Sequence, residues 1–421
     1  MPYLISIPII FLFHGLINWF SYDSIQGEVY NTKTKEAIPY VNIWIKQKDI
    51  RLISNSEGKF IFRVNSSFYQ DTVVFSAIGY KPFFITIKQL LAEKNPKTII
   101  FLQEDTFPLQ EVLIRPLTAR QIVQKAIESI PENHFNVNYQ VKGFYRKAIK
   151  EDSSFASLIE SVVKISKNGY DKQPFQVSYI KSRLSEDYRT YKLPLEKDII
   201  TTALELDHIQ NRRGFLNSYN QANWQFKLID ITNMNHQEVY IIQASLVGND
   251  KTAVHQAKIY IRSEDYAFQK IDYDYTWDAS DLQDNVAPSD TMIFKKYNWK
   301  GSFNYIPYRG KMVLNYFHFV LKQNVYSKNY VNTNRGRLKN IKKLASQESH
   351  EEFIADEIKV FSQPLHKTKI STLSFSESTK PYDETFWKNY LQPVDTKLFI
   401  AIKRDLEKYA PLERLFNIEV H

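Results

Sequence analysis

The 421-residue chain contains no cysteine. Disulfide bridges, thiolate zinc sites, cysteine nucleophiles and a lipid-modified N-terminal cysteine are therefore excluded. A cytosolic protein usually keeps a few thiols, whereas an exported one must pair or lose them, so the absence favours export. Glycine is also scarce, with 11 residues, so Asn and Asp are expected to form many of the turns.

The sequence motifs of the common enzymes are missing as well. There is no Gly-x-Ser-x-Gly elbow, no Gly-rich phosphate loop and no His-Glu-x-x-His zinc helix. The nine histidines are scattered, and no two of them have metal-ligand spacing. His350-Glu351-Glu352 could hold a cation, but it reads more simply as a solvated strand entrance. The sequence therefore predicts no catalytic residue, no metal site and no cofactor.

Carboxylates are the remaining candidates for chemistry. Five aspartates follow one another around Trp277: Asp272, Asp274, Asp278, Asp281 and Asp284. They could bind Ca²⁺, but their spacing is not that of a calcium loop and no glycine supplies its sharp turn. Alternation places Asp272 and Asp274 on one outward strand face. A glycan hydrolase would have to use Glu160, Asp272 or Asp274.

Residues 3–20 carry no charge and are dominated by Leu, Ile and Phe. An apolar run of this kind predicts a signal peptide at residues 1–22, which is removed from the mature protein. Because no basic residue precedes the run, a retained anchor is the alternative. The expected location is exported, in the periplasm or associated with the outer membrane, with no transmembrane helix in the mature chain.

A compact unit of short strands is predicted between residues 23 and 114. Ile25–Val29 and Ile38–Ile45 alternate apolar and polar side chains, which is typical of half-buried strands. Asn55-Ser-Glu-Gly58 is a hairpin signal, since Gly58 can adopt a positive φ. Short strands at this spacing favour a β-sandwich.

Five ordered motifs in this unit resemble a known domain family. They are Ile25-x-Gly27-x-Val29, Ala37-Ile-Pro39-Tyr-Val41-Asn42-Ile43, Asn55-x-Glu57-Gly58-x-Phe60, Phe75-Ser76-x-Ile78-Gly79-Tyr80, and Leu102-x-Glu104-Asp105 with Leu109-x-Glu111-Val112. Together they are similar to the carboxypeptidase-regulatory-like domain, a transthyretin-like β-sandwich. In many Gram-negative proteins this domain precedes TonB-dependent outer-membrane receptors or other envelope modules. The resemblance therefore implies a non-catalytic role in the cell envelope.

Residues 118–421 are predicted to form a larger domain. Thr118 and Gln121 fit a capping box at the start of a helix at 118–130, and further helices are expected at 384–390 and 396–409. Long alternating segments between them predict antiparallel strands, among them Met292–Trp299 and Tyr305–Leu321. The expected fold is mainly β: a β-sandwich domain, then an α+β domain with a large antiparallel sheet or half-barrel and flanking helices.

This larger domain also resembles other proteins, through shorter motifs. Phe144-Tyr145-Arg146 and Asp265-Tyr266-Ala267-Phe268 are similar to an uncharacterised β domain found beside regulatory-like domains in envelope proteins. The hairpin from Ile259 to Phe268 is also similar to half-barrel lipoprotein-carrier folds. That second likeness implies an apolar or lipid ligand inside a half-barrel.

Between Thr291 and Gln347 there is no Asp or Glu, although twelve Lys and Arg occur there. The densest part, residues 322–343, is Asn-rich and lacks apolar periodicity, which predicts a long loop or hairpin tip. Such a loop attracts polyanions. The residues predicted to bind them are Lys322, Lys328, Arg335, Arg337, Lys339, Lys342 and Lys343. A solvated loop paired with acidic surface elsewhere is the alternative.

Three functions remain open from the sequence. The first is a non-catalytic binding or interaction protein of the cell envelope, whose partner is an envelope protein, a glycan or an anionic lipid surface. The second is a periplasmic carrier of an apolar or lipid ligand. The third is a glycan-acting hydrolase. Nucleic acid is not an expected partner, since no nucleic-acid fold signature accompanies the basic residues.

Overall fold

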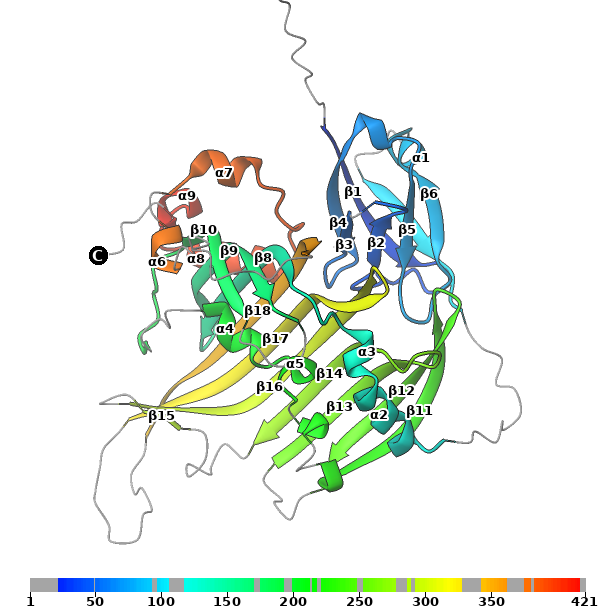
Figure 1. Ribbon diagram of the computed structural model, residues 1–421. Helices are drawn as coiled ribbons and strands as arrows, with labels where there is room; N and C mark the ends of the chain where they lie inside the picture. Colours follow the sequence, from blue (N-terminus) through cyan, green and yellow to red (C-terminus); the bar gives the residue numbers. More distant parts are fainter. Residues whose placement is uncertain are drawn as a thin grey trace, which may run out of the picture.

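The computed structural model describes residues 22–48, 50–92, 97–105, 117–169, 175–192, 199–212, 214–217, 221–247, 253–277, 286–288, 292–327, 342–361, 375–379 and 382–416. Except for Tyr22, the predicted signal peptide lies outside these residues. No helix among them is long and apolar enough to cross a membrane. As expected from the sequence, the protein is mainly β (Figure 1).

The first domain consists of two packed sheets, with strand orders β4-β1-β7 and β3-β2-β5-β6. Its elements are β1 (Tyr22–Asn31), β2 (Asn42–Ile45), β3 (Arg51–Ile53), β4 (Lys59–Asn65), β5 (Thr72–Ser76), β6 (Phe83–Thr86), α1 (Ile87–Ala92) and β7 (Thr98–Leu102). Alternate residues of the strands, including Val29, Phe60 and Phe75, form one buried core. The predicted hairpin lies before β4, where Asn55 Oδ1 accepts from the backbone N–H groups of Glu57 and Lys59 at 2.9 and 3.0 Å.

The second domain is built on one antiparallel sheet. Ten of its described strands follow the order β10-β9-β8-β18-β17-β16-β14-β13-β12-β11, and β15 pairs with β16. The bounds are β8 (Tyr139–Glu151), β9 (Ser154–Lys167), β10 (Gln176–Leu184), β11 (Trp224–Met234), β12 (Gln237–Leu246), β13 (Ala253–Arg262), β14 (Phe268–Trp277), β15 (Val286–Pro288), β16 (Met292–Tyr308), β17 (Lys311–Ser327) and β18 (Lys343–Val360). β18, the last of the described strands, therefore joins β8 to β17 in the middle of the sheet.

One turn lies elsewhere than the sequence predicted. Separate strands were expected at Met292–Trp299 and Tyr305–Leu321, but β16 runs from Met292 to Tyr308 and the turn comes at Arg309 and Gly310, with φ of 48° and 77°. Gly301 lies between the two expected strands. Inside β16, however, a Cβ at this position would collide with Phe319 of the paired strand. That glycine permits close packing and does not mark a turn.

Helices cover the inner face of this sheet, which we define as the face that carries Tyr145, Phe317 and Phe353. They are α2 (Ala119–Glu128), α3 (Ile130–Asn133), α4 (Ile199–Leu204), α5 (His208–Asn211) and α6 (Phe375–Ser378). The predicted capping box is confirmed, since Thr118 and Gln121 exchange side-chain and backbone hydrogen bonds at the start of α2. Apolar side chains of these helices and of the inner face form one continuous buried cluster. The described side chains of the helices therefore pack directly against the inner face.

The opposite, outer face carries Arg146, Tyr316 and Glu352. The sandwich rests on its middle, where the Tyr40 ring centroid lies 4.8 Å from that of Tyr316. The C-terminal helices α7 (Glu384–Asn389), α8 (Lys397–Leu406) and α9 (Leu412–Leu415) lie beside the sandwich (Figure 1). α8 buries Phe399 against Leu158 of β9. The sandwich and the C-terminal helices thus share one side of the sheet.

Candidate functional site

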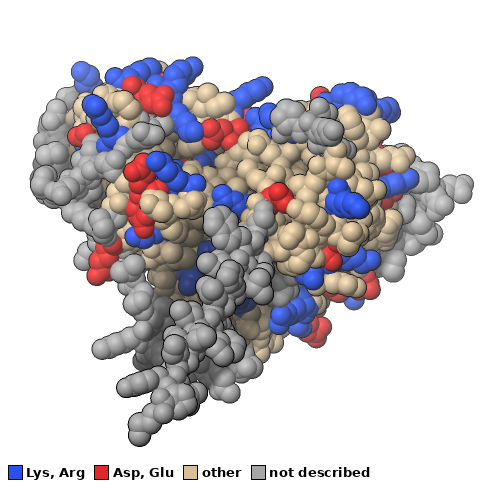
Figure 2. Space-filling view, turned by 90° about the horizontal axis from the view of Figure 1, so that it is seen from above, with Lys and Arg blue, Asp and Glu red and all other residues tan. Residues whose placement is uncertain are grey.

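The predicted polyanion-binding residues fall partly outside the described structure. Lys322 lies in β17 and forms an ion pair with Glu348 at 3.1 Å. Lys342 and Lys343 stand at the start of β18, which pairs antiparallel with β17. Lys328, Arg335, Arg337 and Lys339 lie outside the described residues. On the face in Figure 2, described basic and acidic side chains are interspersed.

Glu160 in β9 is completely buried between two arginines. Arg146 Nε donates to Glu160 Oε1 at 2.8 Å, and Arg183 Nε donates to Oε2 at 2.7 Å. Burial raises the pKa of Glu160, but the charges of Arg183 and Arg146 together outweigh it and hold the pKa below its ordinary value. The guanidinium groups in turn lie over aromatic rings, Arg146 3.5 Å from the Phe399 centroid and Arg183 4.4 Å from that of Trp387. A shielded carboxylate that stays charged is suited to holding α7 and α8 in place, not to proton transfer.

Asp272 and Asp274 share one face of β14, as the alternation predicted. Lys270 binds Asp272 and Lys300 binds Asp274, each at 3.0 Å. Four strands of the sheet separate β14 from β9, so Glu160 lies roughly 24 Å away at the usual strand spacing. Paired glycosidase carboxylates lie only about 5–10 Å apart. Glu160 therefore cannot act together with either aspartate.

The His350-Glu351-Glu352 segment is not the solvated strand entrance that the sequence suggested. It lies in the middle of β18, where cross-strand partners hold its side chains. Glu351 is buried and accepts from the Tyr145 hydroxyl at 2.6 Å, while Glu352 pairs with Arg146 at 3.0 Å. The described residues contain no group of three or more His, Cys, Asp or Glu that could hold a metal ion.

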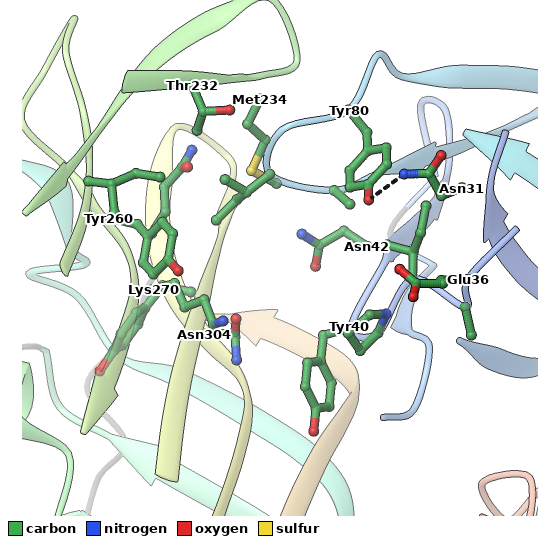
Figure 3. Close-up of a pocket in the computed structure, with 18 of the residues that line it drawn as sticks. Asn31, Glu36, Tyr40, Asn42, Tyr80, Thr232, Met234, Tyr260, Lys270 and Asn304 are labelled. Carbon is green, nitrogen blue, oxygen red and sulfur yellow. Dashed lines mark hydrogen bonds between the residues drawn. The ribbon is translucent and has the colours of Figure 1, made fainter. Parts of the chain in front are cut away.

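A cleft of about 360 Å³ lies between the sandwich and the outer face of the large sheet (Figure 3). The sandwich contributes the end of β1, the β1–β2 loop, Asn42 of β2 and the corner between β5 and β6. The sheet contributes side chains of β11, β12, β13, β14 and β16. Figure 3 shows Asn31, Glu36, Tyr40, Asn42 and Tyr80 on the sandwich side, facing Thr232, Met234, Tyr260, Lys270 and Asn304.

Two side-chain amides in this cleft carry a buried oxygen with no hydrogen-bond partner among the described residues. They are Oδ1 of Asn42 and Oε1 of Gln269, whose side chains line the cleft from opposite domains. Lys270 is committed to Asp272, and its Nζ lies 5.1 Å from the Tyr260 ring centroid. The cleft therefore offers hydrogen-bond acceptors whose donors are not supplied by the described protein.

Tyr40 of the sandwich packs on an uncharged ring of the large sheet. Tyr40 has a φ of 57° and stacks on His318, with ring centroids 5.0 Å apart and planes inclined by 19°. Burial, with a smaller effect of the nearby Lys270 charge, lowers the pKa of His318 to about 4, against the opposing effect of Asp272. His318 is therefore neutral at physiological pH, which permits its burial under Tyr40.

Hydrogen bonds to residues 389–397, the connecting segment between α7 and α8, fix the sandwich. Asn55 Nδ2 donates to the Val394 carbonyl at 3.0 Å, and Arg63 Nη1 donates to that of Asn389 at 2.7 Å. On the other side, Gly79 N–H donates to the carbonyl of Asn233 in β11 at 2.7 Å. The two walls of the cleft are thus held at fixed positions by bonds on both sides of it.

The sequence pointed to neither the cleft nor its amides. Asn42 was noted only as part of the Ala37–Ile43 motif, Gln269 stands in an ordinary strand pattern, and 227 positions separate them. The corner Ile78-Gly79-Tyr80 was recognised as a structural motif, and two of its residues, Ile78 and Tyr80, prove to line the cleft. That motif was the signal that could have pointed to this side of the sandwich.

Comparisons with known proteins identify the first domain. Residues 25–114 match the family model of the CarboxypepD_reg-like domain. No curated protein matches the chain significantly.

Two solved structures are similar over a larger part of the chain. A LolA superfamily protein from Nitrosomonas europaea is 10% identical with a TM-score of 0.21, over 59% of this chain and 96% of that one. A DUF1329 family protein from Desulfovibrio piger is 8% identical with a TM-score of 0.24, over 58% of this chain and 93% of that one. Likenesses this weak say nothing about a ligand. What the comparisons support is the first domain: residues 25–114 match the CarboxypepD_reg-like domain, and this domain is seated on a large antiparallel β domain.

Proposed function

We propose that this protein is a non-catalytic binding protein of the cell envelope and that the cleft between its two domains holds the ligand. The observation that carries the proposal is the cleft itself, a concave site of about 360 Å³ with walls from both domains. Ligand sites occur preferentially at domain interfaces and are usually preformed. The hydrogen bonds to the connecting segment and to β11 supply that preformed geometry.

The state of the carboxylates supports binding without turnover. Glu160 is a shielded ion between Arg146 and Arg183, and a lysine holds each of Asp272 and Asp274. General acid–base catalysis needs groups that can exchange a proton with a substrate in a cleft. None of the three carboxylates proposed from the sequence is in that situation.

The packing of the inner face favours this function over an apolar carrier. A carrier encloses its ligand in a cavity of the half-barrel. Here the buried side chains of α2, α4 and α5 interlock with those of the inner strands in one cluster. The location in the envelope is part of the proposal and is supported by the apolar leader and the absence of cysteine.

The test is a thermal-shift screen of the purified full chain with neutral oligosaccharides, peptides, anionic polymers and lipids. A ligand at one hundred times its Kd stabilises the folded protein by about 2.7 kcal/mol. Thr232→Trp places a large ring in the cleft and should abolish the shift. Thr276→Trp, on the same face of the sheet in β14 but outside the cleft, is the matched control and should keep it.

Two results would overturn the proposal. One is a thermal shift that Thr232→Trp leaves unchanged, because the ligand would then lie elsewhere. The other is sustained conversion of the bound compound to products at a rate that Asp272→Asn or Asp274→Asn removes. That outcome would make the protein an enzyme.

A further inference from the structure

Two amide oxygens in the cleft lack hydrogen-bond donors. Gln269 is 5% exposed, and its Oε1 accepts no hydrogen bond from the described residues; Asn42 Oδ1, across the cleft, is in the same situation. A buried acceptor without a donor costs about 1–3 kcal/mol. A ligand that brings hydroxyl or N–H donors to both oxygens would recover that free energy.

Most strands in the cleft walls already pair with a neighbouring strand on each side. β1 lies between β4 and β7, and β2 lies between β3 and β5. On the opposite wall, β12, β13, β14 and β16 each have a neighbour on both sides. Peptide recognition by strand addition needs an open sheet edge. These strands offer none to the cleft. β11, which also lines the cleft, is the edge strand of the sheet, but its Asn233 carbonyl already accepts from the Gly79 N–H. We therefore expect side chains to supply most of the recognition.

The charges at the cleft disfavour an anionic ligand. Lys270 is already paired with Asp272 at 3.0 Å. Glu36, which Figure 3 shows at the sandwich wall, is exposed and adds a negative charge and further acceptor oxygens. An anion would meet repulsion here, whereas a neutral compound rich in donors would not.

Aromatic rings complete the lining. Tyr80 comes from the sandwich and Tyr260 from β13, and Figure 3 shows their side chains around the cleft. Tyr40 also lines the cleft, but its ring is already stacked on His318. Tyrosine presents a large apolar face with a polar tip. Apolar faces beside hydrogen-bond acceptors match a sugar ring, which has C–H groups on its faces and hydroxyl donors on its rim.

We infer that the cleft binds a short neutral oligosaccharide, whose hydroxyl groups donate to Asn42 Oδ1 and Gln269 Oε1. This inference rests on the proposed binding function and names the class of ligand. A volume of about 360 Å³ is at the small end of ligand pockets, which suits a short saccharide and not a long polymer chain.

The test is isothermal titration calorimetry of the full chain with maltose, cellobiose, lactose and N,N′-diacetylchitobiose. A mixed peptide library and heparin serve as parallel arms. Asn42→Leu and Gln269→Met remove one acceptor each with little change in size, and each should weaken sugar binding about tenfold. Gln256→Met, on the exposed part of β13 outside the cleft, is the control and should bind within twofold of the unchanged protein.

A second measurement separates a binding role from a structural one. Because the two oxygens have no protein donor, Asn42→Leu and Gln269→Met should unfold at the same temperature as the unchanged protein or higher, without sugar. A marked fall in unfolding temperature would show that the amides support the fold, and would overturn the inference.

The remaining outcomes are distinguishable. Sugar binding that both amide variants leave unchanged overturns the site. Binding of peptide or heparin instead of any sugar, abolished by Thr232→Trp, overturns the sugar class and leaves the proposed function standing. No binding in any arm overturns both.

Discussion

The buried ion cluster around Glu160 allows a quantitative prediction. Glu160→Gln keeps the shape of the side chain but removes its charge, leaving Arg146 and Arg183 without their shared buried counter-ion. Removing one partner of a buried ion pair costs about 3–5 kcal/mol. We therefore expect the free energy of unfolding, measured by urea denaturation, to fall by about that amount.

The matched control is Asp274→Asn. Its partner Lys300 is 69% exposed and Asp274 itself 45%, so solvent screens this pair and the expected loss is below about 1 kcal/mol. If the two variants lose equal amounts, the buried cluster does not stabilise the fold as argued. Fluorescence of Trp387, which lies under Arg183, reports the same event locally.

The pH dependence of Glu160→Gln gives an independent check. The folded-state pKa of Glu160 lies below its ordinary value of 4.5, so its stabilising effect is fully present above pH 4.5. The effect is lost as pH falls through the folded-state pKa. The gap between the unchanged protein and Glu160→Gln should therefore narrow below pH 4.5. A gap that stays constant down to acid unfolding would contradict the linkage.

Three further predictions concern other parts of the molecule. Replacing the described residues of the predicted polyanion-binding set with Gln, at Lys322, Lys342 and Lys343, should weaken binding to heparin or anionic vesicles and flatten its salt dependence in co-sedimentation; equal binding would favour a solvated loop. The pKa of His318 is lowered from 6.5 to about 4, so the free energy of unfolding of the unchanged protein should fall by up to roughly 3 kcal/mol as the pH is lowered between those values. Urea titrations at each pH should show a smaller fall for His318→Gln. Arg63→Ala removes the hydrogen bond to Asn389 and should speed limited proteolysis of the connecting segment, whereas Arg309→Ala, in the β16–β17 turn, should not.

Most of the fold could be predicted from local sequence patterns. The capping box at Thr118 needs only two side chains three positions apart, and β14 needs only alternation, so both could be read from the sequence. The expected strands Met292–Trp299 and Tyr305–Leu321 were not joined across Gly301, because a glycine can serve either a turn or close packing. Only the partner strand, with Phe319 opposite Gly301, distinguishes the two.

The candidate site could not be predicted from local sequence patterns. Glu160 resembles any strand carboxylate until β8 and β10 bring Arg146 and Arg183 against it. The cleft depends on how the sandwich docks, which is decided by contacts such as Tyr40 with His318, far apart in the sequence. Neither kind of contact depends on a fixed spacing along the chain, so a single sequence does not reveal it.

The place of β18 in the sheet has a consequence for how the protein is made. Strands β8–β10 and β11–β17 are synthesised first, and until residues 343–360 emerge no described strand bridges the two groups. During that time β8 and β17 are both unpaired edges, which are prone to pair with other chains. The nascent chain must therefore keep two half-sheets apart until its last strand closes the gap, which makes this interval the step at which a chaperone would matter most.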